Sequence, residues 1–223
     1  MSTKRLGRAE ADTALWQSFK RQSIQQAVIR LMCREGLASV TMDRVAQEAG
    51  IAKGTVYLHY RDKQELLDEV KESSLAPLHS RIHELLESEG TPERKLRAFS
   101  LRYLSYFDEQ RDVFRILLYE REVTRVQGGR YQTDRYRRLL EAIAGVVRDG
   151  IKRGHFRHVD ARSVAAMFVE AHIALVNQRL LTARPGPVED DATLVADIFL
   201  RGLDAHEDAA AVVMPERSRR DQR

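Results

Sequence analysis

The stretch TMDRVAQEAGIAKGTVYLHY, residues 41–60, decides the fold of this 223-residue chain. Thr41 is placed to accept a hydrogen bond from the first turn of a helix over residues 42–49. Gly50 then supplies the left-handed backbone that a tight turn requires, and a second short helix follows over residues 53–60. This layout predicts a helix-turn-helix, a motif whose second helix enters the major groove of DNA.

The apolar residues of this stretch predict which sides of the two helices face each other. Val45 and Ala46 of the first helix can pack against Val56 and Tyr60 of the second. Ala46 is small at the point where two helices must cross closely. We therefore assign Val45, Ala46 and Tyr60 to the core rather than to a binding surface.

Polar and small residues of the same stretch are candidates for DNA contact. The amino-terminal end of the helix near Thr41 can hold a phosphate, Lys53 is a long donor at the start of the second helix, and Gly54 lets the backbone approach a base. The alternative roles for Thr41 and Tyr57 are a cap and a packed ring. The predicted DNA-contacting residues are Thr41, Arg44, Lys53, Gly54, Thr55, Tyr57, His59 and Lys63.

Helical periodicity dominates the rest of the chain, and no alternating strand pattern is convincing. We predict an all-α protein, with a three-helix helix-turn-helix domain over residues 17–70, a larger helical domain over 71–206 and a disordered tail over 207–223. The predicted helices cover about residues 17–35, 42–49, 53–60, 63–88, 92–107, 111–126, 129–153, 161–183 and 189–206.

Basic charge is concentrated at the amino-terminal end. Residues 1–63 carry eleven Lys or Arg and six Asp or Glu, a net charge of +5, whereas the whole chain carries +4. The remainder therefore sums to −1. This asymmetry is expected if the amino-terminal end meets a polyanion.

Cysteine and histidine usage gives no reason to assign a metal or a cofactor. Cys33 is the only cysteine of the sequence, so neither an internal disulfide nor a cysteine cluster can form. The pairs His79 and His83, and His155 and His158, have metal-ligand spacing, but no clear third ligand accompanies either pair. The motifs of hydrolases, dinucleotide enzymes, zinc peptidases and phosphate loops are missing, so we predict no enzymatic activity.

The sequence predicts a cytoplasmic protein. Residues 1–8 are basic but have no apolar run behind them, unlike a secretory signal. The most apolar region, residues 164–176, contains Glu170 and His172 and is too short to span a bilayer. A core helix is the favoured interpretation, and we predict no membrane contact.

Over residues 17–70 the chain resembles the DNA-binding domain of the tetracycline-repressor (TetR) family. Many positions agree in register over about fifty residues, which makes the resemblance specific. The matching positions are Arg21, Ile24, Ala27, Gly36, Thr41, Val45, Ala46, Ala49, Gly50, Lys53, Gly54, Thr55, Val56, Tyr57, Tyr60, Lys63, Leu66 and Leu67.

Three positions depart from the family pattern. Met32 and Tyr60 stand where the family commonly has phenylalanine, and the Tyr60 hydroxyl therefore needs a hydrogen-bond partner. Ala52 stands where a serine often caps the recognition helix, and the loss of that cap costs on the order of 1 kcal/mol.

The resemblance implies that the carboxy-terminal domain forms a homodimer and encloses a small-molecule pocket. The family pairs its last two long helices with those of a partner. Residues implied to line the pocket are Tyr103, Phe107, Phe114, Leu118, Met167, Phe168, Glu170 and His172. Residues implied at the dimer interface are Val164, Phe168, Leu175, Val195, Ile198 and Phe199.

The sequence as a whole predicts a homodimeric repressor that a small-molecule ligand releases from a palindromic operator. Two-fold symmetry would present two recognition helices about one DNA turn apart. Two alternatives remain open at this point: a regulator controlled by a partner protein or by its abundance, without a ligand, and an activator.

Overall fold

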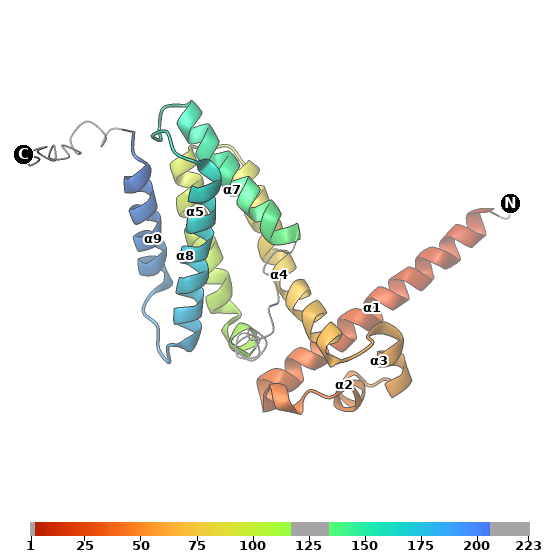
Figure 1. Ribbon diagram of the computed structural model, residues 1–223. Coiled ribbons are helices and arrows are strands. Elements are labelled where there is room, and N and C mark those ends of the chain that lie inside the picture. The colour runs from red at the N-terminus through yellow and green to blue at the C-terminus, as the bar shows by residue number, and fades with distance from the viewer. Residues whose placement is uncertain (1–2, 117–133, 206–223) are drawn as a thin grey trace, which may run out of the picture.

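The computed structural model describes residues 3–116 and 134–205, and for residues 3–14 and 135 it describes the backbone only. Figure 1 shows a small cluster of helices at the amino-terminal end and a larger bundle joined to it by one long helix. The helices are α1 (Thr3–Glu35), the short 3-10 helix η1 (Leu37–Ser39), α2 (Met42–Ala49), α3 (Lys53–His59), α4 (Lys63–Glu87), α5 (Pro92–Glu109), α7 (Asp134–Lys152), α8 (Ala161–Leu181) and α9 (Val188–Leu203).

The predicted all-α class is confirmed, and most helix ends lie within two or three residues of the predicted ones. The first helix is the clear exception, because α1 begins at Thr3 rather than near Gln17. The helix predicted over 111–126 is described only for residues 111–116, which are helical. The first residues of the helix predicted over 129–153 and the predicted tail lie outside the described residues.

The amino-terminal core joins α1 to the two short helices and to the start of α4. Ile24, Val28 and Leu31 of α1 are buried and lie on one face of that helix. They pack with Val45 of α2 and Leu66 of α4 in the same hydrophobic cluster. A seven-residue helix such as α3 is marginal in isolation, so this packing is what keeps α3 in place.

The long helix α4 belongs to both parts of the molecule. Its first turns bury Leu66, Leu67 and Val70 with α1, and its last turns bury Ile82 and Leu86 with the larger bundle. Between these two sections stands Pro77, which cannot donate a backbone hydrogen bond inside the helix. One continuous helix therefore connects the two cores.

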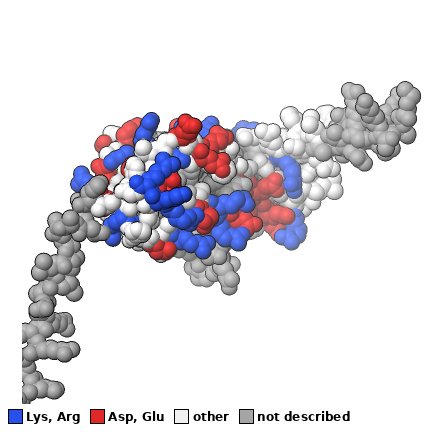
Figure 2. Space-filling view, turned by 90° about the horizontal axis from the view of Figure 1, so that it is seen from above, with Lys and Arg blue, Asp and Glu red and all other residues white. Residues whose placement is uncertain are grey.

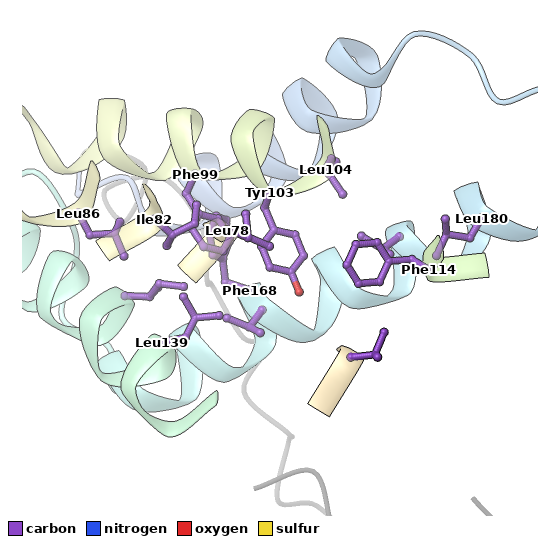
Figure 3. Packing of buried hydrophobic residues seen from close by; sticks show 14 of the residues in the cluster. Leu78, Ile82, Leu86, Phe99, Tyr103, Leu104, Phe114, Leu139, Phe168 and Leu180 are labelled. Atoms are coloured by element: carbon purple, nitrogen blue, oxygen red, sulfur yellow. The ribbon is translucent and has the colours of Figure 1, made fainter. Parts of the chain in front are cut away.

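The core of the larger bundle is apolar and rich in aromatic rings. Phe99 of α5 lies 5.3 Å from Tyr103 and 5.4 Å from Phe168 of α8, measured between ring centroids. Figure 3 shows Leu78 and Ile82 of α4 meeting Phe99 and Phe168 in the same cluster. Aromatic pairs at these separations add to the free energy of burial.

A buried arginine fixes the turn between α8 and α9. The Arg179 guanidinium, 5% exposed, lies 3.1 Å from Asp108 Oδ2 and 2.5 Å from Asp191 Oδ2. It also donates to the Gly186 carbonyl at 3.0 Å. Because two carboxylates and a carbonyl satisfy the buried cation, the ends of α5, α8 and α9 are held together.

Helix α8 is the one described helix that is long and apolar enough to cross a membrane by length and composition. It runs for 21 residues, beyond the apolar region noted in the sequence. In this fold it is a core helix, because it packs on α5 and α7 and buries Phe168, Val169 and Val176.

The buried polar pair His172 and Ser100 lies at the centre of this bundle. His172 Nδ1 is 2.7 Å from the Phe168 carbonyl, and Nε2 is 2.9 Å from Ser100 Oγ. Burial lowers the pKa of His172 to about 4, so the imidazole is neutral at neutral pH. It then donates from Nδ1 to the carbonyl and accepts at Nε2 from the serine hydroxyl.

Acidification is expected to destabilise the fold through His172. An unfolded histidine has a pKa of about 6.5, so between pH 6.5 and 4 the unfolded chain binds this proton more strongly than the folded one. Stability is therefore lost as pH falls through this window, with a loss of about 2 kcal/mol between pH 7 and 5.

Urea unfolding of the wild type and of His172→Gln at these two pH values measures the effect. Glutamine keeps hydrogen-bonding capacity but does not titrate, so the variant should lose less stability than the wild type. An identical pH dependence in both proteins would show that His172 is not responsible.

Candidate nucleic-acid interface

The amino-terminal end of α2 has the geometry predicted for it. The Thr41 side chain caps the helix, because its Oγ1 accepts a hydrogen bond from the Arg44 backbone N–H at 3.3 Å. Gly50 ends the helix with φ 67° and ψ 32°, the left-handed conformation that glycine adopts without strain. Thr41 itself is exposed, so the capped helix end is open to solvent.

Helix α3 is held by Val56 and by Tyr60, the residue that ends it. Tyr60 is 1% exposed, and burial is the main cause of its raised pKa. Its hydroxyl, which the sequence left in need of a partner, accepts a hydrogen bond from Gln25 Nε2 at 3.3 Å. Gln25 also donates to Glu69 at 3.0 Å, so this chain of contacts ties α3 to α1 and α4.

The outward side of α3 carries three of the predicted DNA-contacting residues. Lys53, Gly54 and Tyr57 are exposed, and Thr55 is partly buried. Leu58, which sequence reasoning missed, is 83% exposed on the same short helix. The sequence could have indicated this exposure, because Leu58 stands midway between Val56 and Tyr60, which are four residues apart and face the core. An exposed leucine here is suited to contact with a thymine methyl group.

The start of α3 lacks a side-chain cap, as the alanine at position 52 predicted. Ala52 occupies the N-cap position and makes no side-chain hydrogen bond to the helix. The first backbone N–H groups of α3 are therefore not satisfied by a side chain, and solvent or a phosphate can satisfy them.

Two of the predicted DNA-contacting cations are paired with carboxylates of the same domain. Lys53 Nζ lies 2.6 Å from Asp43 Oδ1, and Arg44 Nη2 lies 2.5 Å from Glu35 Oε2. The hydrogen bond that the Lys53 ammonium donates to Asp43 raises the pKa of Lys53. The Lys53 ammonium also lies 5.9 Å from the centre of the Tyr57 ring. Both cations are therefore paired within the domain.

Lys63 has a structural role that the sequence did not indicate. Its Nζ donates to the Leu37 carbonyl at 3.1 Å, and the side chain is partly buried. The start of α4 is thereby attached to η1. An ammonium has three donors, so two remain for the predicted phosphate contact.

His59 lies at the edge of an open groove between α1, α3 and α4. Burial and the nearby charges of Arg21 and Lys20 lower its pKa, so the ring is a neutral group at neutral pH. Its carbonyl accepts a hydrogen bond from Arg21 at 3.4 Å. The groove encloses about 790 Å³ and is lined by Gln17, Ser18, Arg21, Gln22, Gln25, Leu58, His59 and Glu69.

Five of the residues implied to line a pocket lie together in the carboxy-terminal core. Phe114 lies 4.6 Å from Phe107, Phe107 lies 5.1 Å from Tyr103, and His172 lies 5.8 Å from Tyr103 and 4.4 Å from Phe168, between ring centroids. The rings are in contact, so a ligand entering between them must displace side chains.

Two of the other pocket candidates lie elsewhere. Met167 is 57% exposed on the outside of α8, and Glu170 is exposed, where its carboxylate accepts a hydrogen bond from the Tyr136 hydroxyl at 2.5 Å. Neither lines the core, because both lie on the side of α8 opposite the buried aromatic rings. Leu118 lies outside the described residues.

The residues implied at a dimer interface divide into two groups. Val164, Phe168 and Val195 are buried inside the subunit, so they are not available to a partner in this structure. Leu175 and Phe199 are partly buried, and Ile198 is 62% exposed. In the sequence α8 is apolar on nearly all sides. Such a pattern does not distinguish the side that faces the core of its own subunit from a side that faces a partner.

One histidine of each pair considered for a metal has a carboxylate partner. His83 Nε2 lies 3.2 Å from Glu87, and His155 Nδ1 lies 2.7 Å from Glu93. Among the described residues, no group of three or more His, Cys, Asp or Glu side chains is placed to hold a metal ion.

Two family models match the chain, and they cover the two parts seen in the fold. Residues 24–70 match the model of bacterial regulatory proteins of the tetR family. Residues 89–177 match the tetracyclin repressor-like carboxy-terminal domain. The chain therefore belongs to the TetR family, and it is a DNA-binding transcriptional regulator of the helix-turn-helix type.

Similar proteins support the same assignment. The chain is 24% identical to the uncharacterized HTH-type transcriptional regulator YhgD of Bacillus subtilis, over 84% of this chain and 98% of that one. It is 23% identical to the HTH-type transcriptional repressor KstR2 of Mycobacterium tuberculosis, over 62% and 70%. The regulator FadR of Bacillus subtilis, solved in complex with stearoyl-CoA, shares the fold with a TM-score of 0.63 at 17% identity, over 82% and 98%.

Replacement of Gly54 is expected to change stability and DNA affinity in opposite directions. A Cβ added at Gly54 meets no atom within 4 Å, and alanine favours a helix by up to about 1 kcal/mol over glycine. Gly54→Ala should therefore raise the thermal stability of the free protein slightly. The same methyl group should weaken binding to a specific duplex at least tenfold, because it separates the helix from the base edges.

Gly145→Ala is the matched control, since Gly145 lies in α7 and its added Cβ would make only an ordinary contact at 3.9 Å with Arg148. It should leave DNA affinity unchanged. Circular dichroism melting and fluorescence anisotropy measure the two quantities, and wild-type affinity in Gly54→Ala would exclude a close approach of α3 to DNA.

Proposed function

We propose that this chain is a homodimeric repressor that binds a palindromic operator through α3 and releases it when a small apolar molecule binds the carboxy-terminal domain. The observation that carries the DNA-binding surface is the outward side of α3. Lys53, Gly54, Tyr57 and Leu58 are exposed there, while Val56 fixes the helix from the other side. A helix fixed on one side and open on the other can enter a major groove.

The proposed dimer forms through the outer sides of α8 and α9. Met167 and Leu181 of α8 are 57% and 71% exposed, and Leu194 and Ile198 of α9 are 56% and 62% exposed. Large exposed apolar side chains on two neighbouring helices support an association surface there. This proposal replaces Val164, Phe168 and Val195 with residues that a partner can reach.

The proposed coupling between ligand and operator runs through α4. Leu78 and Ile82 of this helix pack in the cluster that holds Phe99 and Phe168, while Leu66 packs in the DNA-binding domain. A ligand that separates the aromatic rings therefore acts on the carboxy-terminal half of α4 directly. Release requires that the ligand bind the non-binding conformation more tightly than the binding one.

The proposed effector is a long apolar molecule, such as a fatty acyl thioester. Two observations support this class. The five pocket candidates that lie together are aromatic or histidine side chains, of which His172 and Tyr103 supply polar atoms in an otherwise apolar cluster. FadR, which shares the fold, was solved with stearoyl-CoA. We also propose that the protein acts in the cytoplasm, where DNA and such thioesters are both present.

The proposed function is tested by selecting an operator and then releasing the protein from it. Duplexes enriched by the purified protein from a random pool should contain an inverted repeat, and binding should weaken steeply with salt. A series of acyl-CoA molecules of increasing chain length should release the protein with a preferred length, whereas free CoA should not. A selected sequence without two-fold symmetry, or binding that no member of the series weakens, would contradict the corresponding part of the proposal.

Charges placed on the outer side of α9 are expected to separate the subunits. In a two-fold dimer each substitution occurs twice at the interface, so Leu194→Asp combined with Ile198→Asp should raise the dissociation constant of the dimer about a hundredfold or more. Operator affinity should fall with it. Leu101→Asp, on an exposed position of α5, is the control and should stay dimeric. Analytical ultracentrifugation measures the change, and a dimeric double variant would place the interface elsewhere.

A further inference from the structure

The first turn of α2 and the first residue of α3 are joined by one ion pair. Asp43 Oδ1 lies 2.6 Å from Lys53 Nζ, and both side chains are more than half exposed. Exposed pairs of this kind add little to stability, typically below about 1 kcal/mol. The fold therefore depends little on this contact, which lies at the surface that α3 exposes to solvent.

The position of Asp43 is unusual for a surface that meets a polyanion. It is the acidic residue in the first turn of α2, directly beside the helix end that Thr41 caps and that would otherwise attract a phosphate. Its carboxylate therefore opposes phosphate binding twice, by its own charge and by occupying one donor of Lys53. A domain selected only for tight binding to DNA would gain from its removal.

We propose that Asp43 is a positioning residue that sets the sequence specificity of DNA binding by holding the Lys53 ammonium. This inference rests on the proposed role of α3 in DNA binding. With one of its three donors directed at Asp43, Lys53 has two donors left for a ligand. The N7 and O6 acceptors of a guanine can accept hydrogen bonds from both donors. A phosphate of a random duplex has to compete with the Asp43 carboxylate for the ammonium.

The proposal predicts unequal effects on specific and random DNA. In Asp43→Asn the Lys53 ammonium is free to turn to the nearest phosphate, so affinity for a random duplex should rise about tenfold. On a selected operator the same gain in phosphate affinity is offset, because Lys53 is no longer oriented toward its base. The ratio of operator to random affinity should therefore fall at least fivefold.

The salt dependence gives a second readout that a merely structural role would not move. A dimer carries two copies of Asp43, and each freed lysine adds about one released counterion. The slope of log affinity against log salt on random DNA should become steeper by about two.

Three further variants make the test decisive. Asp68→Asn removes the same charge from an exposed position of α4 and should leave the ratio unchanged. Asp43→Glu keeps the charge but displaces the carboxylate, so random affinity should stay low while the preferred base changes. In a Lys53→Gln background, Asp43→Asn should no longer alter the ratio.

Anisotropy titrations with an operator selected by the wild-type dimer and with a random duplex supply all the values. An unchanged ratio and salt slope in Asp43→Asn would overturn the proposal. A wild-type protein that binds no duplex in a salt-dependent way would instead overturn the proposed function, so the two failures are distinguishable.

Discussion

The buried ring of Tyr60 is the contact on which the DNA-facing surface depends. Helix α3 is too short to persist alone, and Val56 and Tyr60 hold it to the domain. Around the tyrosine, Gln25 reaches its hydroxyl, Glu69 reaches Gln25, and the Arg21 guanidinium lies 5.6 Å from the ring centre. Because these partners come from α1 and α4, the direction of α3 is set by the same packing that joins the domain to the rest of the protein.

Many charged side chains of the described residues form ion pairs, and charges of one sign do not gather into a single patch. Along α1 and α2, Arg30 and Arg34 both contact Glu48, and Glu35 bridges Arg34 to Arg44. On the face shown in Figure 2, side chains of both charges are intermingled. Several cations of residues 1–63 are therefore paired with neighbouring carboxylates, which reduces the positive charge that is available to a polyanion. Local geometry sets which cations are free to act.

The elements with strong local signals could be predicted from the sequence. The ends of α2 followed from Thr41 and Gly50, whose cap and turn conformations are decided within a few residues. The start of α1 was not predicted, because residues 3–16 include Gly7, Asp12 and Thr13, residue types that favour turns and caps over a helix interior. The role of Lys63 was missed for a different reason: the carbonyl of Leu37 is distant in sequence. The burial of Val164, Phe168 and Val195 within the subunit could not be predicted, since an apolar side chain such as Val195 has the same pattern whether it faces its own subunit or a partner.

The unbroken course of α4 has a geometric consequence. At 1.5 Å per residue its 25 residues span roughly 37 Å, so a tilt of one degree about its carboxy-terminal end displaces its amino-terminal end by roughly 0.6 Å. A rotation of about five degrees then shifts α3 by one base step, which is about 3.4 Å. In the proposed dimer, a rotation of α4 of this size would be enough to put the two copies of α3 out of register with the grooves of the operator.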